Sequence, residues 1–107
     1  MSNQKKSGLK KKSQLFEFVL YISGATENSR LALLNTRSLA DKHLEGRYHL
    51  AVVDLYQYPR RASLHDVIAL PMLVNMLPLP VRRMVGDLSD EGRVLTWLDL
   101  PPMKSAL

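Results

Sequence analysis

Three prolines divide residues 69–88 into short apolar pieces, and this stretch constrains the fold more than any other part of the chain. Pro71, Pro78 and Pro80 each fix φ near about −65° and lack a backbone N–H donor. Because of this, neither one long helix nor one central strand can run through them. The chain must therefore bend at each proline, and only short elements fit between the bends.

Length and cysteine content exclude several classes of protein. A chain of 107 residues forms one small domain, and the sequence contains no cysteine. Disulfide scaffolds, thiolate zinc sites and dithiol redox chemistry are therefore excluded. No apolar run approaches the length of about 20 residues that a membrane span needs, and no signal peptide is recognisable. We expect a soluble, cytoplasmic protein.

Five lysines among residues 1–13 account for the whole formal net charge of +5. The rest of the chain carries ten basic and ten acidic residues, so its charges balance. We expect residues 1–13 to form a disordered, solubilising tail, because they contain no aromatic side chain on which a nucleic-acid base could stack. Residues 14–102 would form the folded domain, and residues 103–107 a short C-terminal tail.

The remaining pattern predicts alternating strands and helices. Nearly continuous apolar runs at residues 15–22 and 48–55 are typical of strands covered on both faces, so both strands are expected in the middle of a sheet. A helix between them, running to about Leu44 and ended by Gly46, would make a βαβ unit with parallel strands. A short helix at residues 62–69, strands at 72–76 and 82–86, and a last helix with Ser89 as N-cap would follow.

The first helix is predicted to be amphipathic. At 100° per residue its sheet-facing side is formed by Ala32, Leu33, Thr36, Leu39, Ala40 and Leu44. Leu31 and Leu34 fall on the opposite side among polar residues. They are either isolated surface leucines or part of a contact with a partner or a second copy of the chain.

The element order β-α-β-α-β-β-α, with Pro71 just before the third strand, is that of an α/β thioredoxin-like fold with a four-stranded mixed sheet. Thioredoxins place Cys-x-x-Cys after the first strand, where this chain has residues Ala25 to Asn28. Without a thiolate there is no disulfide exchange. The three histidines lack the spacing of a zinc site, and no Gly-rich phosphate loop occurs. We therefore expect no enzymatic activity, metal or cofactor.

Several short motifs of this sequence resemble those of the KaiB family across residues 14–100. They are Leu20 to Gly24, Asn28-Ser29, Val53 to Leu55, Ala69 to Leu73 and, most specifically, the block from Leu77 to Ser89. The resemblance implies a non-enzymatic protein that binds the P-loop ATPase ring KaiC and helps to time its phosphorylation. It also implies a possible second arrangement of the C-terminal half, the ground-state fold of clock members.

The sequence also departs from the family pattern. Clock members have basic residues where this chain has Val19, Leu31 and Ala51, a proline in place of Leu79 and a glycine in place of Trp97. Two functions therefore remain open. One is a regulator of a KaiC-like ATPase in a circadian, timing or stress-adaptation system. The other is a self-associating thioredoxin-like interaction or sensor module, a dimer or tetramer that has lost the ATPase.

Two sets of residues are expected to carry these roles. The candidate partner-binding residues are Arg82, Arg83, Arg30, Leu31 and Leu34. The candidate fold-determining residues are Pro71, Pro78, Pro80, Gly86, Asp87 and Asp99. Because neighbours in a strand face opposite sides, only one arginine of the Arg82-Arg83 pair should reach a given partner, while the other meets solvent or a carboxylate such as Asp87.

Overall fold

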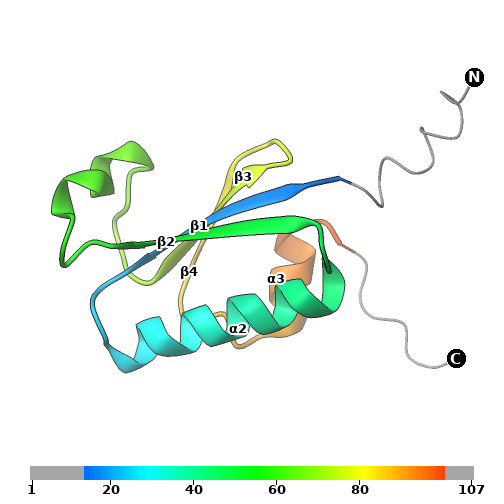
Figure 1. The fold of residues 1–107 in the computed structure, drawn as a ribbon, viewed down its shortest axis with the longest axis horizontal. Helices are drawn as coiled ribbons and strands as arrows, with labels where there is room; N and C mark the ends of the chain where they lie inside the picture. The colour runs from blue at the N-terminus through cyan, green and yellow to red at the C-terminus, as the bar shows by residue number, and fades with distance from the viewer. Residues whose placement is uncertain (1–13, 101–107) are drawn as a thin grey trace, which may run out of the picture.

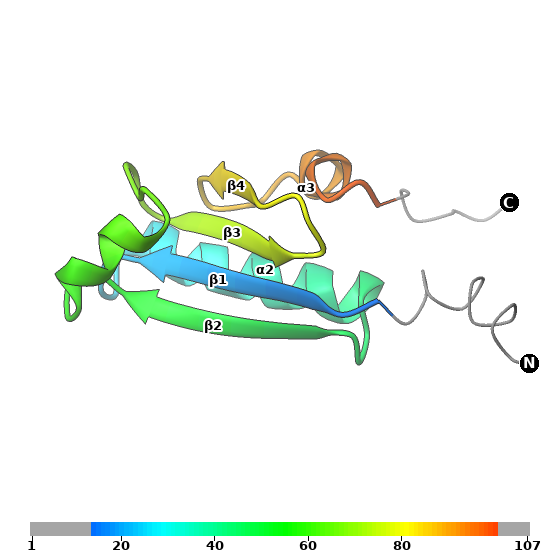
Figure 2. The same cartoon turned by 90° about the horizontal axis from the view of Figure 1, so that it is seen from above.

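The computed structural model describes residues 14–100, which form one mixed sheet and its coverings. The elements are β1 (Phe16–Ile22), α2 (Glu27–His43), β2 (Tyr48–Asp54), the 3-10 helix η1 (Pro59–Leu64), β3 (Met72–Leu77), β4 (Arg82–Val85) and α3 (Glu91–Trp97). Figure 2 shows the strand order β2-β1-β3-β4. β1 runs parallel to β2 and antiparallel to β3, and β3 runs antiparallel to β4. The predicted four-stranded mixed sheet is therefore confirmed.

The two apolar runs of the first half occupy different places in this sheet. β1 lies between β2 and β3, and Phe16, Phe18 and Leu20 are buried, as predicted. The prediction that the second run is also central is wrong, because β3 pairs with the other side of β1 and leaves β2 at the edge. Ala51 and Val52 are accordingly exposed. An apolar run alone did not distinguish an edge strand from a central one.

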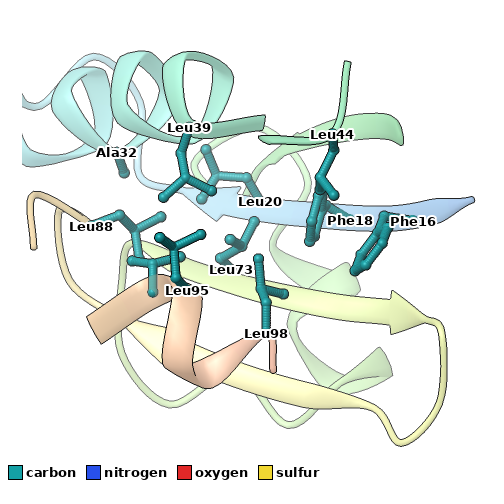
Figure 3. Close-up of a cluster of buried hydrophobic side chains, with 11 residues drawn as sticks. Phe16, Phe18, Leu20, Ala32, Leu39, Leu44, Leu73, Leu88, Leu95 and Leu98 are labelled. Atoms are coloured by element: carbon teal, nitrogen blue, oxygen red, sulfur yellow. The ribbon is translucent and has the colours of Figure 1, made fainter. Parts of the chain in front are cut away.

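Helix α2 begins and ends through local interactions. Thr26 is its N-cap, with Oγ1 accepting a hydrogen bond from the Ser29 N–H at 3.2 Å. Gly46, with φ of +71°, follows its C-terminus. The predicted sheet-facing side is confirmed: Leu33 is half-buried, and the other members are buried. Figure 3 shows Ala32 and Leu39 of α2 meeting Leu20 of β1, with Leu95 and Leu98 approaching from α3.

Two details of the second half differ from the prediction. The helix expected at residues 62–69 is instead η1, which begins earlier, at Pro59, because proline suits the first helical position. Asp90, and not Ser89, caps α3, its Oδ1 accepting a hydrogen bond from the Arg93 N–H at 3.1 Å. The expected tails at residues 1–13 and 103–107 lie outside the described residues.

The two faces of the sheet are covered differently (Figure 1). Helices α2 and α3 cover one face and enclose the main core. On the opposite face, the connection at residues 55–71, which contains η1, supplies Leu55, Val67 and Leu70. They pack on the second cluster of buried residues, Tyr21, Met72 and Val74. The peptide bonds preceding Pro71, Pro78 and Pro80 are cis.

Candidate partner-binding surface

The end of the sheet where β1 meets α2 holds polar groups that support the backbone. Asp54 Oδ1 accepts hydrogen bonds from the Gly24 N–H at 2.8 Å and the Tyr56 N–H at 2.9 Å. The Thr26 hydroxyl is engaged as the cap of α2. These groups fix turns, and the residues at 25–28 offer no thiol. Chemistry of the thioredoxin type is therefore impossible here.

An open hollow of about 780 Å³ lies beside these turns. Thr26 and Asn28 line it from the start of α2, and Leu55, Ile68 and Pro71 line it from the other side. Ile68 is 89% exposed. The hollow is lined by apolar side chains and by helix-capping groups whose hydrogen bonds are already made. Such a lining can contact the surface of another protein, but it offers no nucleophile paired with a base.

The three histidines lie apart. His43 Nε2 is 2.8 Å from Glu91 Oε2, between α2 and α3. His65 belongs to the 55–71 connection, and His49 is exposed on β2. Within residues 14–100, no three histidine, aspartate or glutamate side chains are grouped closely enough to hold a metal ion.

Sequence reasoning missed the pairing of Tyr21 with His65. The Tyr21 hydroxyl lies 2.6 Å from His65 Nδ1, and Tyr21 is 1% exposed. Burial raises the pKa of Tyr21, opposed by the nearby Arg61. The hydroxyl therefore stays protonated at neutral pH and can donate to the imidazole. A buried tyrosine hydroxyl usually has a hydrogen-bond partner. The sequence does not show that this partner is His65, which lies 44 residues away.

Arg82 and Arg83 point to opposite faces of β4, as predicted. Arg82 is half-buried on the helix side, and its Nη1 donates to the main-chain carbonyl of Trp97. Arg83 is exposed on the other face, and its Nε donates to the His65 carbonyl at 2.9 Å. The suggested pairing with Asp87 does not occur, because the Asp87 Oδ1 instead accepts from the Ser89 N–H at 3.0 Å. Of the two arginines, Arg83 is the more exposed.

The candidate residues on α2 differ in their contacts and in their exposure. Arg30 is paired with Glu27 at 2.7 Å, and its hydrogen bond and charge lower the pKa of Glu27. Leu34 is 51% exposed, whereas Leu31 is half-buried. Leu31 lies one turn from Asn35, whose side chain reaches the loop before α3 by donating to the Asp87 carbonyl at 2.8 Å. Leu34 lies two helical turns before Asp41, which accepts a hydrogen bond from the Tyr48 hydroxyl of β2 at 2.6 Å.

The candidate fold-determining residues lie around β4 and α3. Gly86 has φ of +125° and donates its N–H to the Pro71 carbonyl at 2.9 Å, which ties the end of β4 to the start of β3. Asp87 accepts from Asn35 and Ser89, so it joins α2 to the loop before α3. Asp99 adopts φ of +61° just after α3. Each lies at a junction between elements.

Asn75 is a second residue that sequence reasoning missed. It is 3% exposed, its Nδ2 donates to the Pro78 carbonyl at 3.0 Å, and its Oδ1 has no hydrogen-bond partner among residues 14–100. It borders a cavity of about 550 Å³ together with Phe16, Arg82 and Asp99. The signal was one amide in the otherwise apolar run of β3. Its donor fixes the turn that Pro78 begins.

Comparison with known proteins finds similarity over the same body of the chain. A family model described as the KaiB domain matches residues 19–100. The circadian clock oscillator protein KaiB of Prochlorococcus marinus (strain MIT 9313) is 44% identical over 81 residues, which cover 76% of this chain and 68% of the relative.

Solved structures show the fold. The N-terminal domain of Synechococcus elongatus SasA gives a TM-score of 0.66 at 16% identity, covering 88% of this chain and 90% of that domain. The Drosophila melanogaster thioredoxin Deadhead gives a TM-score of 0.63 at 12% identity, covering 92% of each chain. The arrangement of these elements is therefore thioredoxin-like, including its C-terminal half. Between residues 14 and 100, no helix has the length and apolar character needed to cross a membrane.

Proposed function

Because this chain belongs to the KaiB family of non-enzymatic clock proteins, we propose that it regulates a KaiC-like ATPase by binding to it in the cytoplasm. The setting is a circadian, timing or stress-adaptation system. The chain itself transforms no substrate, and nucleotide turnover belongs to the partner.

The observation that carries this proposal is that the family match spans residues 19–100, nearly all of the described body. The position of Arg83 supports it. Arg83 is exposed, and within residues 14–100 only its Nε makes a hydrogen bond, to the His65 carbonyl. The two Nη groups can donate a bidentate pair of hydrogen bonds to a carboxylate of the partner. Arg82 instead donates to the Trp97 carbonyl, so its proposed role is to stabilise the fold.

The test is co-elution of the purified chain with a KaiC-like ring from the same organism in the presence of ATP or ADP. We expect the ring to elute earlier when the chain is bound, and we expect Arg83→Ala to weaken binding about tenfold or more, the loss that follows from one charged hydrogen-bonded pair. The matched control is Arg93→Ala, an exposed arginine on α3. A ring that never changes its elution in any nucleotide state would contradict the proposal.

A second function is favoured by one specific observation. Val19 and Ala51 are direct cross-strand neighbours, so two of the positions that differ from clock members meet on one face of the sheet. Apolar residues in place of basic ones at these two positions favour contact with an apolar surface over contact with charged groups. The second candidate is therefore a self-associating interaction or sensor module that has lost the ATPase. It would oligomerise normally while leaving the ring unbound.

A further inference from the structure

A short motif in the 55–71 connection has no part in the roles described so far. Residues 60–64 are Arg-Arg-Ala-Ser-Leu, so Ser63 follows two arginines and precedes a leucine. Ala62 is half-buried, and the other four residues are exposed. The motif belongs to η1, which lies over the sheet face opposite to α2 and α3 (Figure 1). A serine hydroxyl, two guanidinium groups and an apolar side chain are therefore presented together at the surface.

The two arginines of this motif carry charge that the described fold does not balance. Among residues 14–100, neither Arg60 nor Arg61 forms an ion pair with a carboxylate. The Arg61 guanidinium carbon lies 5.0 Å from the centre of the Tyr58 ring, a cation–π contact that leaves its charge in place. Both guanidinium groups can therefore pair with carboxylates of a second protein.

One class of enzyme recognises this combination of side chains. Arginine-directed serine kinases bind the arginines two and three residues before the serine with carboxylates, and they bind the next, apolar residue in a pocket. Arg60 and Arg61 occupy these two positions before Ser63, and Leu64, which is 67% exposed, follows it. The serines of residues 1–13 follow lysines instead, which lack the planar fork that matches a carboxylate.

We propose that Ser63 is a phosphorylation site for an arginine-directed serine kinase. In the transfer, the Ser63 Oγ bonds to the γ-phosphorus of ATP, the bond from that phosphorus to its bridging oxygen breaks, and ADP leaves. The hydroxyl proton passes to the catalytic aspartate of the kinase. The proposal does not depend on the ATPase partner.

The local structure of η1 opposes entry into a kinase cleft only weakly. The cleft takes the substrate in an extended form, so the turn around Ser63 has to open. The bonds of this turn include one from the Arg61 N–H to the Tyr58 carbonyl at 3.1 Å and one from the Ser63 hydroxyl to the Arg60 carbonyl at 3.2 Å. Ala62 is half-buried, and no residue of η1 is buried. Segments that bury so little open at low cost in free energy.

A phosphate on Ser63 acts first on the arginines beside it. Side chains three residues apart are eclipsed in a 3-10 helix, so Arg60 and Ser63 lie on the same side of η1. Phosphoserine carries a charge of about −1.5 to −2, and its oxygens accept hydrogen bonds from guanidinium groups. Modification therefore cancels the two positive charges of this surface. It also removes the hydroxyl proton that Ser63 donates to the Arg60 carbonyl.

The first test incubates the full chain with ATP and the catalytic subunit of cAMP-dependent protein kinase, an arginine-directed serine kinase. Tandem mass spectrometry locates the phosphate, which we expect on Ser63, and Ser63→Ala should lose it. Arg60→Ala and Arg61→Ala should each lower the initial rate about tenfold, because each removes one charged hydrogen-bonded pair with the kinase. The matched control is Arg37→Ala, at an exposed arginine of α2, which should keep the rate.

Two further measurements test the place of the motif in the fold and its use in the cell. A free peptide of residues 57–67 should react no more than about tenfold faster than the full chain, because opening η1 costs little. A cell extract of the same organism, supplied with ATP, should phosphorylate Ser63 in the full chain but not in a variant with both Arg60→Ala and Arg61→Ala. A full chain that stays unmodified while the peptide reacts, arginine variants that react at the wild-type rate, or an extract that leaves Ser63 unmodified would each overturn the proposal.

Discussion

At the scale of single residues, Gly86 shows how a backbone angle is selected. Its φ of +125° lies in a region that L side chains rarely adopt, although among residues 14–100 no atom beyond its two chain neighbours lies within 4 Å of where a Cβ would stand. The requirement for glycine is therefore conformational and not a matter of space. The sequence motif indicated that Gly86 matters, but not that its N–H reaches the Pro71 carbonyl.

Gly86→Ala should lower the free energy of unfolding by about 1–3 kcal/mol, the usual cost of holding an L residue in a sparsely populated backbone region. Urea denaturation measures the change. The control is Gly92→Ala in α3, where alanine suits the helix and should leave stability equal or higher by up to about 1 kcal/mol. Equal losses in the two variants would contradict the conformational explanation.

Other residue roles depended on contacts that sequence spacing cannot show. The alternation of Arg82 and Arg83 followed from strand geometry and was correct, whereas their partners, the carbonyls of Trp97 and His65, are brought near by the fold. Asn75 was overlooked because a polar residue in an apolar strand has no obvious partner until the turn at Pro78 is in place.

At the scale of elements, strand and helix identities were predictable, and neighbours in the sheet were less so. The periodicity of α2 correctly gave its buried side. The apolar run of β2 suggested a central strand, but the placement of β3 beside β1 decides which strands become edges. The predicted 62–69 helix failed because a proline at residue 59 starts the 3-10 turn earlier.

The contact between α2 and α3 predicts a pH-dependent stability. Hydrogen bonds from His43 and then Lys42 lower the pKa of Glu91 below its ordinary value of 4.5. A lowered carboxyl pKa stabilises the fold above the ordinary value, and this contribution is lost as the pH falls through the lowered pKa. Glu91→Gln should therefore cost up to about 1 kcal/mol at pH 7, as expected for a partly exposed pair, and should cost less at pH 3.

Urea unfolding of both chains at the two pH values measures this difference. Glu45→Gln is the control, because Glu45 is exposed in the turn after α2. A Glu91→Gln deficit that is as large at pH 3 as at pH 7 would show that packing, and not charge, connects the two helices.

At the scale of the whole molecule, the sheet is firmly covered on one face and lightly covered on the other. The helix side encloses the main core, whereas the 55–71 connection covers only part of the opposite face, and its Tyr56, Leu64 and Ile68 are exposed. The thioredoxin-like architecture was predictable from element order and Pro71. The path of this connection was not, because it depends on the distant pair of Tyr21 and His65.

Tyr21→Phe removes the hydroxyl that attaches this connection to the sheet. We expect it to cost about 0.5–1.5 kcal/mol, the net value of one hydrogen bond, and to speed amide exchange at residues 59–71 while α2 is unchanged. Tyr56→Phe is the control, since Tyr56 is 82% exposed. Unchanged exchange in the connection would show that apolar packing alone holds it.

The double attachment of His65 has a consequence for recognition. Its ring meets Tyr21, while its carbonyl accepts from Arg83 on β4. A carboxylate arriving from outside and taking the Nε of Arg83 would have to displace that carbonyl. Only a carboxylate bound through the Nε would release the 55–71 connection, and its affinity would be lower by the free energy of the displaced hydrogen bond, whereas a carboxylate bound through the two Nη groups would leave the connection in place.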